Sequence, residues 1–361
     1  MNSLKGFFIR KVGNKKSHPF DLNAVKTLYI KCGRIGDTVV KTPFIKLIKE
    51  KYPHIEITAC GVGGAEKILE ANPYITNVIA SKGEKSKIRF VRIIKDLAHS
   101  LRERGKYDLC FNLGNSVNFF KLLSLRLLKA KLIIGGPKLE KYGLKSTELT
   151  LINRYIHFTQ RHSCYKWLEV AEHMDIEVDS YDKYRYDIHI PEEIQVKHRD
   201  YYNDKEINLV FNFRGSSDRK SLPWEDVEYF LREISEVDQR VCLHLMAPPL
   251  FYCEAEKIIK KLNIKNVRML PKTESILEAA ELLKGADMLF SVDTGVVHMA
   301  SAFDIPMVVI YPNNPDTLVE YSPRCSNFKI ITAPEYTGNN IEGYNLDEVM
   351  TNIQEMLNFI H

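Results

Sequence analysis

The chain has 361 residues, of which 45% are hydrophobic and 27% charged, as is typical of a soluble globular protein with two domains of ordinary size. No apolar run approaches the length of a membrane span and no secretory signal is visible, so we expect a cytoplasmic protein. The seven scattered cysteines, odd in number and without a CxxC pair, predict buried thiols in a reducing compartment and argue against a disulfide framework.

Charge is distributed unevenly along the chain. Residues 1–190 contain 34 Lys and Arg against 19 Asp and Glu, a net charge of +15, whereas residues 191–361 contain 17 against 27, a net charge of −10. The basic residues of the first half concentrate in three runs, at 5–16, 82–106 and 121–145. This half suits an anionic partner, and composition alone leaves both nucleic acid and a membrane leaflet as candidates.

The first 25 residues are basic and loosely patterned, with three consecutive apolar residues at Phe7, Phe8 and Ile9. Three interpretations stay open for this segment: a frayed terminus, a membrane-surface anchor, or packing onto the first domain.

The next stretch predicts the first strand, loop and helix of a parallel α/β unit. A strand is expected over 27–31 and a helix over 39–51, with Pro43 in the early turns of the helix. The glycine-flanked loop between them is typical of an anion-binding or active-site loop. Asp37 is expected at the cap of the helix, where the default interpretation of a lone Asp is an ordinary N-cap.

Three further strands are predicted in the first half, at 55–60, near Val78 and at 107–113. The loop Gly61-Val62-Gly63-Gly64 resembles a dinucleotide-binding fingerprint, but Glu66 occupies the third glycine position and the loop follows the second strand. We therefore reject NAD binding on this signal. Residues 82–106 predict a basic amphipathic helix.

A second alternation of strands and helices begins after the stretch 187–193, where the charge balance changes and where we place the linker. Its first strand, 207–213, is followed by a polar glycine loop that contains Ser216, Ser217 and Lys220. Strands are then predicted at 241–246 and 267–270, and helices at 223–236, 254–262, 275–283 and 345–360.

The stretch 286–312 predicts a strand–turn–helix–strand unit of a parallel sheet. Its turn combines the carboxyl end of a strand with the amino end of a helix, where free N–H groups and the helix dipole favour an anion. The turn contains Asp293, Thr294 and Gly295, and His298 lies one helical turn later. Asp293 and Thr294 could merely cap the helix, but a cap requires neither Gly nor His, so a phosphate site is favoured.

Two strand–helix series joined by one linker predict an α/β protein with two doubly wound Rossmann-like domains facing a central cleft. The predicted domains are 1–190 and 191–361, and packing against the first domain is one option for the last helix, 345–360. Ligands of such sheets bind at the carboxyl ends of strands, and large pockets favour domain interfaces. Asp37 is then expected on one side of the cleft, with Lys220 and residues 293–298 on the other.

Four segments together resemble glycosyltransferase family 9, the ADP-heptose:lipopolysaccharide heptosyltransferases. The N-terminal pair is IKCGRIGDTVVKTPFIKLIKEKYPHIEIT followed by LEANPYITNVI. The C-terminal pair is GSSDRKSLPWEDVEYF followed by GADMLFSVDTGVVHMASAFDIPMVVIYPNNP. The resemblance covers about half of the chain, in both domains and in the right order, and the middle, roughly 115–200, matches no motif of the family.

The resemblance implies a GT-B fold, a nucleotide-sugar donor on the C-terminal domain, an acceptor on the N-terminal domain, and inversion without a metal or other cofactor. Asp37 would be the general base, with Arg34, Gly36 and Asn112 on the acceptor side. The donor diphosphate and sugar would be held by seven residues: Ser216, Ser217, Lys220, Asp293, Thr294, Gly295 and His298. Where the family often has a glycine-rich turn and a Glu for the donor ribose, this chain has Ala247-Pro248-Pro249-Leu250, which leaves Glu254 as the candidate ribose contact.

The function implied is transfer of a sugar, most simply heptose from ADP-heptose, onto a lipopolysaccharide or lipooligosaccharide core. The partners implied are the nucleotide-sugar donor, an anionic glycolipid acceptor and the inner-membrane surface, on whose cytoplasmic face the protein would be peripheral. The chemistry agrees, because a carboxylate can deprotonate the acceptor hydroxyl while a lysine, hydroxyls and a helix N-terminus stabilise the leaving diphosphate.

Two alternatives stay open. A nucleotide-sugar epimerase of the same architecture would need further acid and base groups and no acceptor surface, and the basic first half argues against it. A non-catalytic module that binds a nucleotide sugar or nucleic acid has no need of a carboxylate at Asp37. Nucleic acid is disfavoured because aromatic residues should alternate with the basic ones, and the run 82–106 contains only Phe90.

Overall fold

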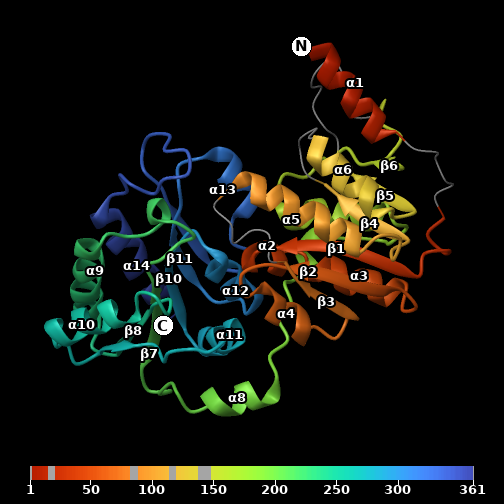
Figure 1. Cartoon of the computed structure of the whole chain (residues 1–361). Coiled ribbons are helices and arrows are strands. Elements are labelled where there is room, and N and C mark those ends of the chain that lie inside the picture. The colour runs from red at the N-terminus through yellow and green to blue at the C-terminus, as the bar shows by residue number, and fades with distance from the viewer. Residues whose placement is uncertain (1, 15–20, 82–87, 114–118, 137–147, 361) are drawn as a thin grey trace. The chain divides into compact units, whose positions relative to one another are not determined.

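The structure is a computed structural model that describes residues 2–14, 21–81, 88–113, 119–136 and 148–360 (Figure 1). Its contacts divide the chain into two compact units, Met1–Lys183 and Tyr184–His361. The predicted boundary was seven residues later, at 190/191. Parts of the basic runs 5–16, 82–106 and 121–145 lie outside the described residues.

The first unit contains a sheet of six parallel strands in the order β3-β2-β1-β4-β5-β6. Each of the longer strands is buried because its side chains on both faces pack under helices, as expected for a parallel sheet. The strands are β1 (Thr27–Gly33), β2 (Glu56–Gly61), β3 (Asn77–Ala80), β4 (Leu109–Asn112), β5 (Leu132–Gly135) and β6 (Arg154–Tyr155).

The helices of the first unit connect these strands and cover the sheet. They are α1 (Asn2–Gly13), α2 (Ile35–Val39), α3 (Thr42–Lys51), α4 (Ala65–Ala71), α5 (Arg89–Arg102), α6 (Phe119–Leu128) and α7 (Ser163–Glu172). α6 contacts both α1 and α5, and α3 contacts α7. The predicted amphipathic helix in the run 82–106 is thus found as α5.

The second unit repeats the architecture with the order β12-β11-β10-β7-β8-β9, again all parallel. The strands are β7 (Ile207–Asn212), β8 (Val241–Met246), β9 (Val267–Met269), β10 (Met288–Val292), β11 (Met307–Ile310) and β12 (Phe328–Ile331). The helices are α8 (Glu192–His198), α9 (Trp224–Val237), α10 (Tyr252–Leu262), α11 (Ile276–Lys284), α12 (Gly295–Ala302), α13 (Pro315–Tyr321) and α14 (Leu346–Ile360).

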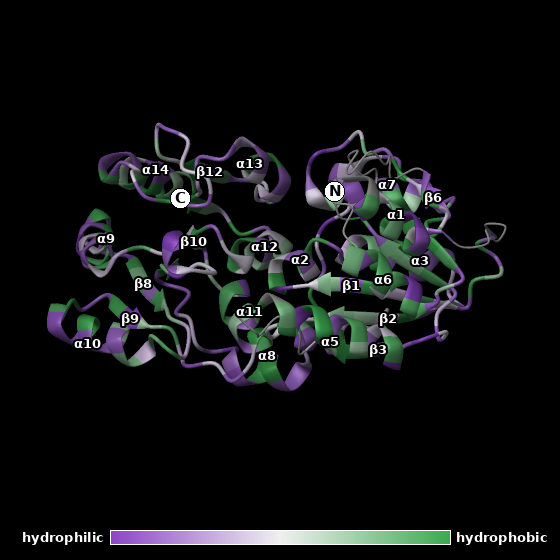
Figure 2. Ribbon diagram, turned by 45° about the horizontal axis from the view of Figure 1, so that its top comes forward, coloured by the Kyte–Doolittle hydropathy of each residue, from purple (hydrophilic) through white to green (hydrophobic). Residues whose placement is uncertain are grey.

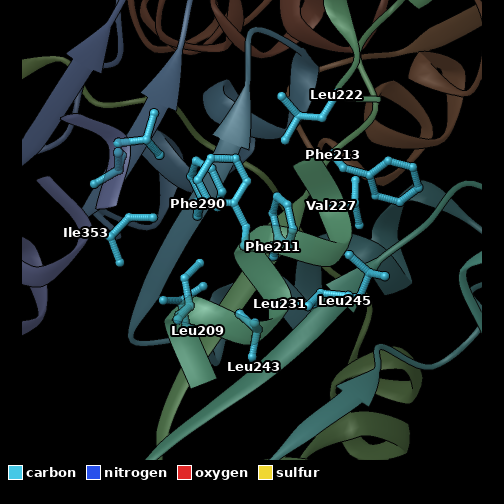
Figure 3. Packing of buried hydrophobic residues seen from close by; sticks show 14 of the residues in the cluster. Leu209, Phe211, Phe213, Leu222, Val227, Leu231, Leu243, Leu245, Phe290 and Ile353 are labelled. Carbon is cyan, nitrogen blue, oxygen red and sulfur yellow. The ribbon is translucent and has the colours of Figure 1, made fainter. Parts of the chain in front are cut away.

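Aromatic residues on the central strands of the second sheet fill the layer between the sheet and its helices (Figure 3). Phe211 on β7 stacks on Phe290 of β10 at a centroid distance of 4.7 Å, and Phe230 of α9 meets the same ring edge-on at 5.0 Å. Hydropathy follows this layering, with hydrophobic residues concentrated along the strands and hydrophilic residues on the loops (Figure 2). α14 contributes Ile353 and Leu357 to this core, so the last helix buries its apolar face within its own unit.

Both sheets have the strand order of a doubly wound fold, in which the direction of winding reverses between the first and fourth strands. The reversal lies between β1 and β4 in the first unit and between β7 and β10 in the second. Ligands of such sheets bind outside the carboxyl ends of the strands at this switch point. The prediction of two doubly wound α/β domains is confirmed, while the cleft between them stays a prediction.

The first helical segment differs from the prediction. A single helix was expected over 39–51 with Asp37 at its cap, but α2 begins earlier, at Ile35, and α3 begins at Thr42. Pro43 explains the break, because it lacks an N–H and its ring would clash with the carbonyl of Val39. Asp37 therefore lies inside the first turn of α2, whose N-cap is Arg34, and the N-cap prediction was wrong.

Candidate active site

Asp37 lies at the carboxyl end of the first sheet, directly after β1. Gly33 ends β1 with φ +90°, a conformation that favours glycine, and a Cβ there would lie 3.0 Å from Asp37 Oδ2. The carboxylate is half-buried against this glycine. Within the described part of the chain, no group donates a hydrogen bond to it, so it can accept a proton from a ligand.

A buried lysine supports the same loop. Lys41 Nζ donates to the carbonyl oxygen of Cys32 at 2.6 Å and to that of Asp37 at 2.7 Å, which ties the end of β1 to α2. The ammonium also lies 5.5 Å from the ring centroid of Trp167. Burial lowers the pKa of Lys41, and the nearby Asp37 charge opposes this. Lys41 was not predicted from the sequence, although a lysine inside the largely apolar segment Val39 to Phe44 is a signal for a buried cation.

The three residues predicted on the acceptor side lie around this loop. Asn112 is the last residue of β4, across the switch point from β1, and is buried. Its Nδ2 has no hydrogen-bond partner among the residues that the structure describes, which is unusual for a buried amide. Arg34 is exposed, and Gly36 lies within α2, where its carbonyl accepts from Val40 N at 3.1 Å.

In the second unit, Lys220 and Asp293 form an ion pair across the switch point. Lys220 follows β7 and Asp293 follows β10, and Lys220 Nζ donates to Asp293 Oδ2. Their side chains are 18% and 10% exposed, so the pair is shielded but reachable from solvent. Asn212 of β7 donates to Ser291 Oγ of β10 at 2.9 Å, which joins the two strands at their carboxyl ends.

The loop that carries Lys220 has a fixed shape. A Cβ on Gly215 would lie 2.1 Å from the Lys220 carbonyl oxygen, so only glycine allows this close approach of the two backbone segments. Ser221 Oγ accepts from Gly215 N at 3.1 Å and donates to the Ser217 carbonyl at 2.8 Å. Ser216 and Ser217 are exposed beside Lys220. The role of Ser221, which closes the loop, was not predicted from the sequence.

Thr294 and Gly295 form the start of α12 at the same edge of the sheet. Thr294 is the N-cap residue, but its side chain makes no capping hydrogen bond. The Asp293 carboxylate accepts a hydrogen bond from the Lys220 ammonium. Helix capping therefore explains neither Asp293 nor Thr294 at these positions. The first N–H groups of α12 are therefore not capped by these side chains, and such groups favour an anion.

His298 is buried in α12 and packs among tyrosines. Its ring centroid lies 6.1 Å from that of Tyr186 and 6.3 Å from that of Tyr321. Tyr311, fully buried nearby, donates to the Tyr321 carbonyl at 2.7 Å. Burial, and after it the Asp293 charge, raises the pKa of Tyr311 well above its ordinary value. Two tyrosine rings that the sequence did not reveal, Tyr186 and Tyr321, thus lie beside His298.

Glu254 is exposed in the first turn of α10, after the loop that follows β8. The same loop holds Phe251, and the Arg214 guanidinium carbon lies 3.9 Å from its ring centroid. Arg214 also pairs with Asp218 at 2.7 Å. The Arg214–Phe251 contact, which the sequence did not indicate, joins the loop after β7 to the loop after β8.

The structure therefore brings Lys220, Asp293, Thr294 and Gly295 to one edge of the second sheet, and Asp37 and Asn112 to the corresponding edge of the first. Among the described residues, no cluster of three or more His, Cys, Asp or Glu side chains could hold a metal ion.

The chain matches the model of a known protein family. The family model described as "Glycosyltransferase family 9 (heptosyltransferase)" matches residues 94–342. The chain belongs to glycosyltransferase family 9, and it is a glycosyltransferase.

Individual relatives resemble the chain along nearly its whole length. A protein of Escherichia coli K12 named "Putative lipopolysaccharide heptosyltransferase 4" is 23% identical over 366 residues, which cover 100% of this chain and 94% of the relative. A family 9 glycosyltransferase structure from Veillonella parvula superposes with a TM-score of 0.70 at 18% identity, covering 95% of this chain and 100% of that one. The E. coli heptosyltransferase WaaC with ADP superposes at 0.66 with 20% identity, covering 91% and 99%.

These superpositions establish the predicted GT-B fold. The UDP-GlcNAc 2-epimerase of Methanocaldococcus jannaschii superposes less well, with a TM-score of 0.52 at 15% identity, covering 92% of this chain and 93% of that one. The epimerase alternative therefore finds a more distant match than the heptosyltransferase.

Proposed function

We propose that this enzyme transfers heptose from ADP-heptose to a lipopolysaccharide or lipooligosaccharide core, with inversion at the anomeric carbon. Family membership supports sugar transfer. The relative named as a lipopolysaccharide heptosyltransferase supports the choice of lipopolysaccharide as the acceptor. WaaC, whose structures contain ADP and ADP-2-deoxy-2-fluoro heptose, supports the choice of ADP-heptose as the donor.

The observation that carries the proposal is the Lys220–Asp293 pair beside the N-terminus of α12. Asp293 holds the Lys220 ammonium in place before the donor binds, so the diphosphate meets a preorganised cation. Lys220, the hydroxyls of Ser216 and Ser217, and the first N–H groups of α12 would share its negative charge. We assign to these groups the role that a metal ion has in other transferases, and to Glu254 a contact with the donor ribose.

Asp37 would be the general base. Its carboxylate takes the proton of the acceptor hydroxyl while that oxygen forms a bond to the anomeric carbon from the face opposite the diphosphate. The bond between the anomeric carbon and the diphosphate oxygen breaks, and its electron pair leaves with ADP. Because the new bond forms opposite the old one, a single displacement inverts the configuration.

The acceptor would be an anionic glycolipid on the cytoplasmic face of the inner membrane. The first unit contains 33 Lys and Arg against 18 Asp and Glu, a net charge of +15, whereas the second has a net charge of −10. A basic unit attracts both a phosphorylated glycolipid and an anionic leaflet. Arg34 and the Asn112 amide would contact the acceptor beside Asp37.

The test is a transfer assay with the purified full chain, ADP-heptose and a core oligosaccharide acceptor. We expect an acceptor-dependent release of ADP and a product with inverted anomeric configuration by NMR. ADP-heptose should raise the melting temperature more than a UDP-sugar does, because a ligand that binds the folded state stabilises it. Conversion of the donor to an epimer without acceptor would show an epimerase, and donor binding without transfer would show a binding protein; either result overturns the proposal.

A further inference from the structure

The helix α1 has apolar side chains on two opposite faces. Gly6, Ile9 and Gly13 form a buried stripe, and Ile9 belongs to the core cluster that includes Leu122 of α6. The opposite face carries Leu4, Phe7 and Phe8, which are 62%, 60% and 48% exposed. Positions i, i+3 and i+4 share one side of a helix, so these three side chains form one surface. A helix that is apolar on both sides normally packs on both sides.

This surface is held in a defined orientation by the end of α1. Arg126 of α6 donates to the carbonyl oxygens of Lys11 and Val12 at 3.2 and 3.1 Å. The Gly13 carbonyl accepts from Leu151 N at 2.8 Å, and a Cβ on Gly13 would lie 2.8 Å from Leu149 Cδ2. The other end of α1 projects beyond the sheet in Figure 1. The exposed apolar face therefore belongs to a fixed helix.

The charged side chains of α1 itself are all basic, and one of them, Arg10, pairs with Glu148 at 3.4 Å. Residues 1–20 contain Lys5, Arg10, Lys11, Lys15 and Lys16 and no acidic residue. Lys11 follows Leu4 by seven residues, so it lies on the same side of the helix as the apolar surface. A helix with aromatic and aliphatic residues flanked by lysines is suited to the boundary between lipid headgroups and acyl chains.

Among the described residues, no helix combines the length and apolar character that crossing a bilayer requires. At 12 residues α1 could only lie in the interface. A second copy of the chain fits the face less well, because two such faces would bring their lysines together.

We propose that α1 lies in the surface of an anionic bilayer, with Leu4, Phe7 and Phe8 among the acyl chains and Lys5 and Lys11 at the level of the lipid phosphates. The inference deepens the proposed function by naming the element that holds the enzyme on the leaflet of its acceptor. It rests on that function for the choice of leaflet alone.

The test measures binding of the full chain to vesicles of phosphatidylcholine with and without phosphatidylglycerol. We expect binding to the anionic vesicles, weakened as salt screens the charges. The variant L4S/F7S/F8S should lower the partition coefficient by about 10-fold or more, and each of Lys5→Gln and Lys11→Gln by about 5-fold. In the variant Phe7→Trp, tryptophan emission should shift to shorter wavelength on anionic vesicles, as expected for a side chain that enters the acyl region.

A matched control removes exposed apolar residues elsewhere. The variant V196S/F328S/F359S replaces side chains that are 55%, 40% and 61% exposed in the second unit, and it should bind vesicles like the wild type. Equal binding by L4S/F7S/F8S and wild type, or no emission shift in the Phe7→Trp variant, would overturn the proposal. So would loss of self-association, without loss of vesicle binding, in L4S/F7S/F8S.

The vesicle assay contains neither donor nor acceptor, so it separates this inference from the proposed function. If the protein binds anionic vesicles through α1 but transfers no sugar, only the proposed function fails. If L4S/F7S/F8S keeps both wild-type vesicle binding and transfer to a soluble core oligosaccharide, only the inference about α1 fails.

Discussion

The switch points of the two sheets each carry a lysine and an aspartate, but the two pairs are arranged in opposite ways. In the first unit Lys41 is buried and donates to two backbone carbonyls, which leaves the Asp37 carboxylate without a hydrogen-bond donor among the described residues. In the second unit the carboxylate of Asp293 is occupied by Lys220, whose ammonium stays partly exposed. The first arrangement offers a base, and the second offers a cation.

The difference shows how one architecture can supply two chemical roles. An aspartate that is not neutralised by a nearby hydrogen-bonded cation can take up a proton, whereas a lysine held by a carboxylate is oriented toward an anion that arrives later. Five experiments test whether the two lysine–aspartate pairs differ in this way, and the one with the strongest predicted effect comes first.

Asp37→Asn should lower kcat by about 100-fold or more, because the amide keeps the shape of the side chain but cannot accept a proton. Donor binding, measured by thermal shift, should be unchanged because the proposed donor site lies in the second unit. Asp21→Asn makes the same chemical change at an exposed position of the first unit and serves as the control. A D37N variant that keeps more than about a tenth of wild-type kcat would remove Asp37 from the role of base.

The second experiment measures the acid stability of the second unit. Burial lowers the pKa of His244 to about 4, from an ordinary value near 6.5. The unfolded state therefore binds more protons between these values, and the second unit should lose up to about 3 kcal/mol of stability as pH falls through this window.

The chain has one tryptophan in each unit, Trp167 and Trp224. Urea unfolding at neutral and acidic pH can be followed at Trp224 alone in a Trp167→Phe background. His244→Gln should reduce the pH dependence of the urea midpoint. An unchanged pH dependence in His244→Gln would show that other groups cause the acid sensitivity.

Lys220→Ala should lower kcat/KM for the donor by roughly 10- to 100-fold, since a hydrogen bond to a charged group contributes about 1.5–3 kcal/mol. Lys205→Ala, at an exposed lysine of the same unit, is the control. A double-mutant cycle with Asp293→Asn tests the pairing, because two residues that act together give effects that do not add. Additive effects would mean that Asp293 does not orient Lys220 for the donor.

Lys41→Met should destabilise the first unit by about 1–3 kcal/mol, because the carbonyls of Cys32 and Asp37 lose a buried donor. The loss is measured by urea unfolding followed at Trp167, whose ring lies next to the ammonium. Lys46→Met on α3, at a partly exposed position, is the control. We expect kcat to fall because the loop that carries Asp37 loses its support, while KM for the donor stays constant. A raised KM for the donor with normal kcat would instead place Lys41 in the donor site.

The smallest expected effect is that of metal removal. If Lys220 and the start of α12 stabilise the diphosphate, EDTA should leave the rate of transfer unchanged. Loss of activity that magnesium or manganese restores would mean that the second switch point needs a metal ion. Lys220 would then not be the cation that stabilises the diphosphate, and the contrast with Lys41 would fail.

The strands flanking the site could be predicted from sequence because they are short, largely apolar runs that end in polar loops, as in β11 and in β8, whose one polar residue is His244. The strand β12 has an exposed beginning, and β6 has two residues, so neither gives a clear pattern. The sequence also places Lys220 and Asp293 at the carboxyl edge of one sheet. Their ion pair could not be predicted, because it depends on the contact of Gly215 with the Lys220 backbone.

The position of Asp37 shows a different limit. Its place after the first strand follows from the sequence, but the start of α2 depends on the left-handed backbone of Gly33, which propensities do not reveal. The burial of Lys41 likewise depends on Trp167, which is 126 positions further along the chain. Contacts between residues so distant in sequence arise from packing and not from local pattern.

The residues that begin the second unit determine how the chain can be divided for study. Arg324 is buried and donates to the carbonyl oxygen of Tyr184 at 2.8 Å, and its guanidinium carbon lies 5.4 Å from the ring centroid of Tyr186. A fragment that starts at Pro191, where composition places the linker, lacks Tyr184 and Tyr186. The Arg324 guanidinium would then lose a hydrogen-bond acceptor and an aromatic ring. A fragment that starts at Tyr184 keeps both, together with the whole sheet from β7 to β12. The second unit should therefore be expressed from Tyr184 onward, which also keeps the tyrosines beside His298.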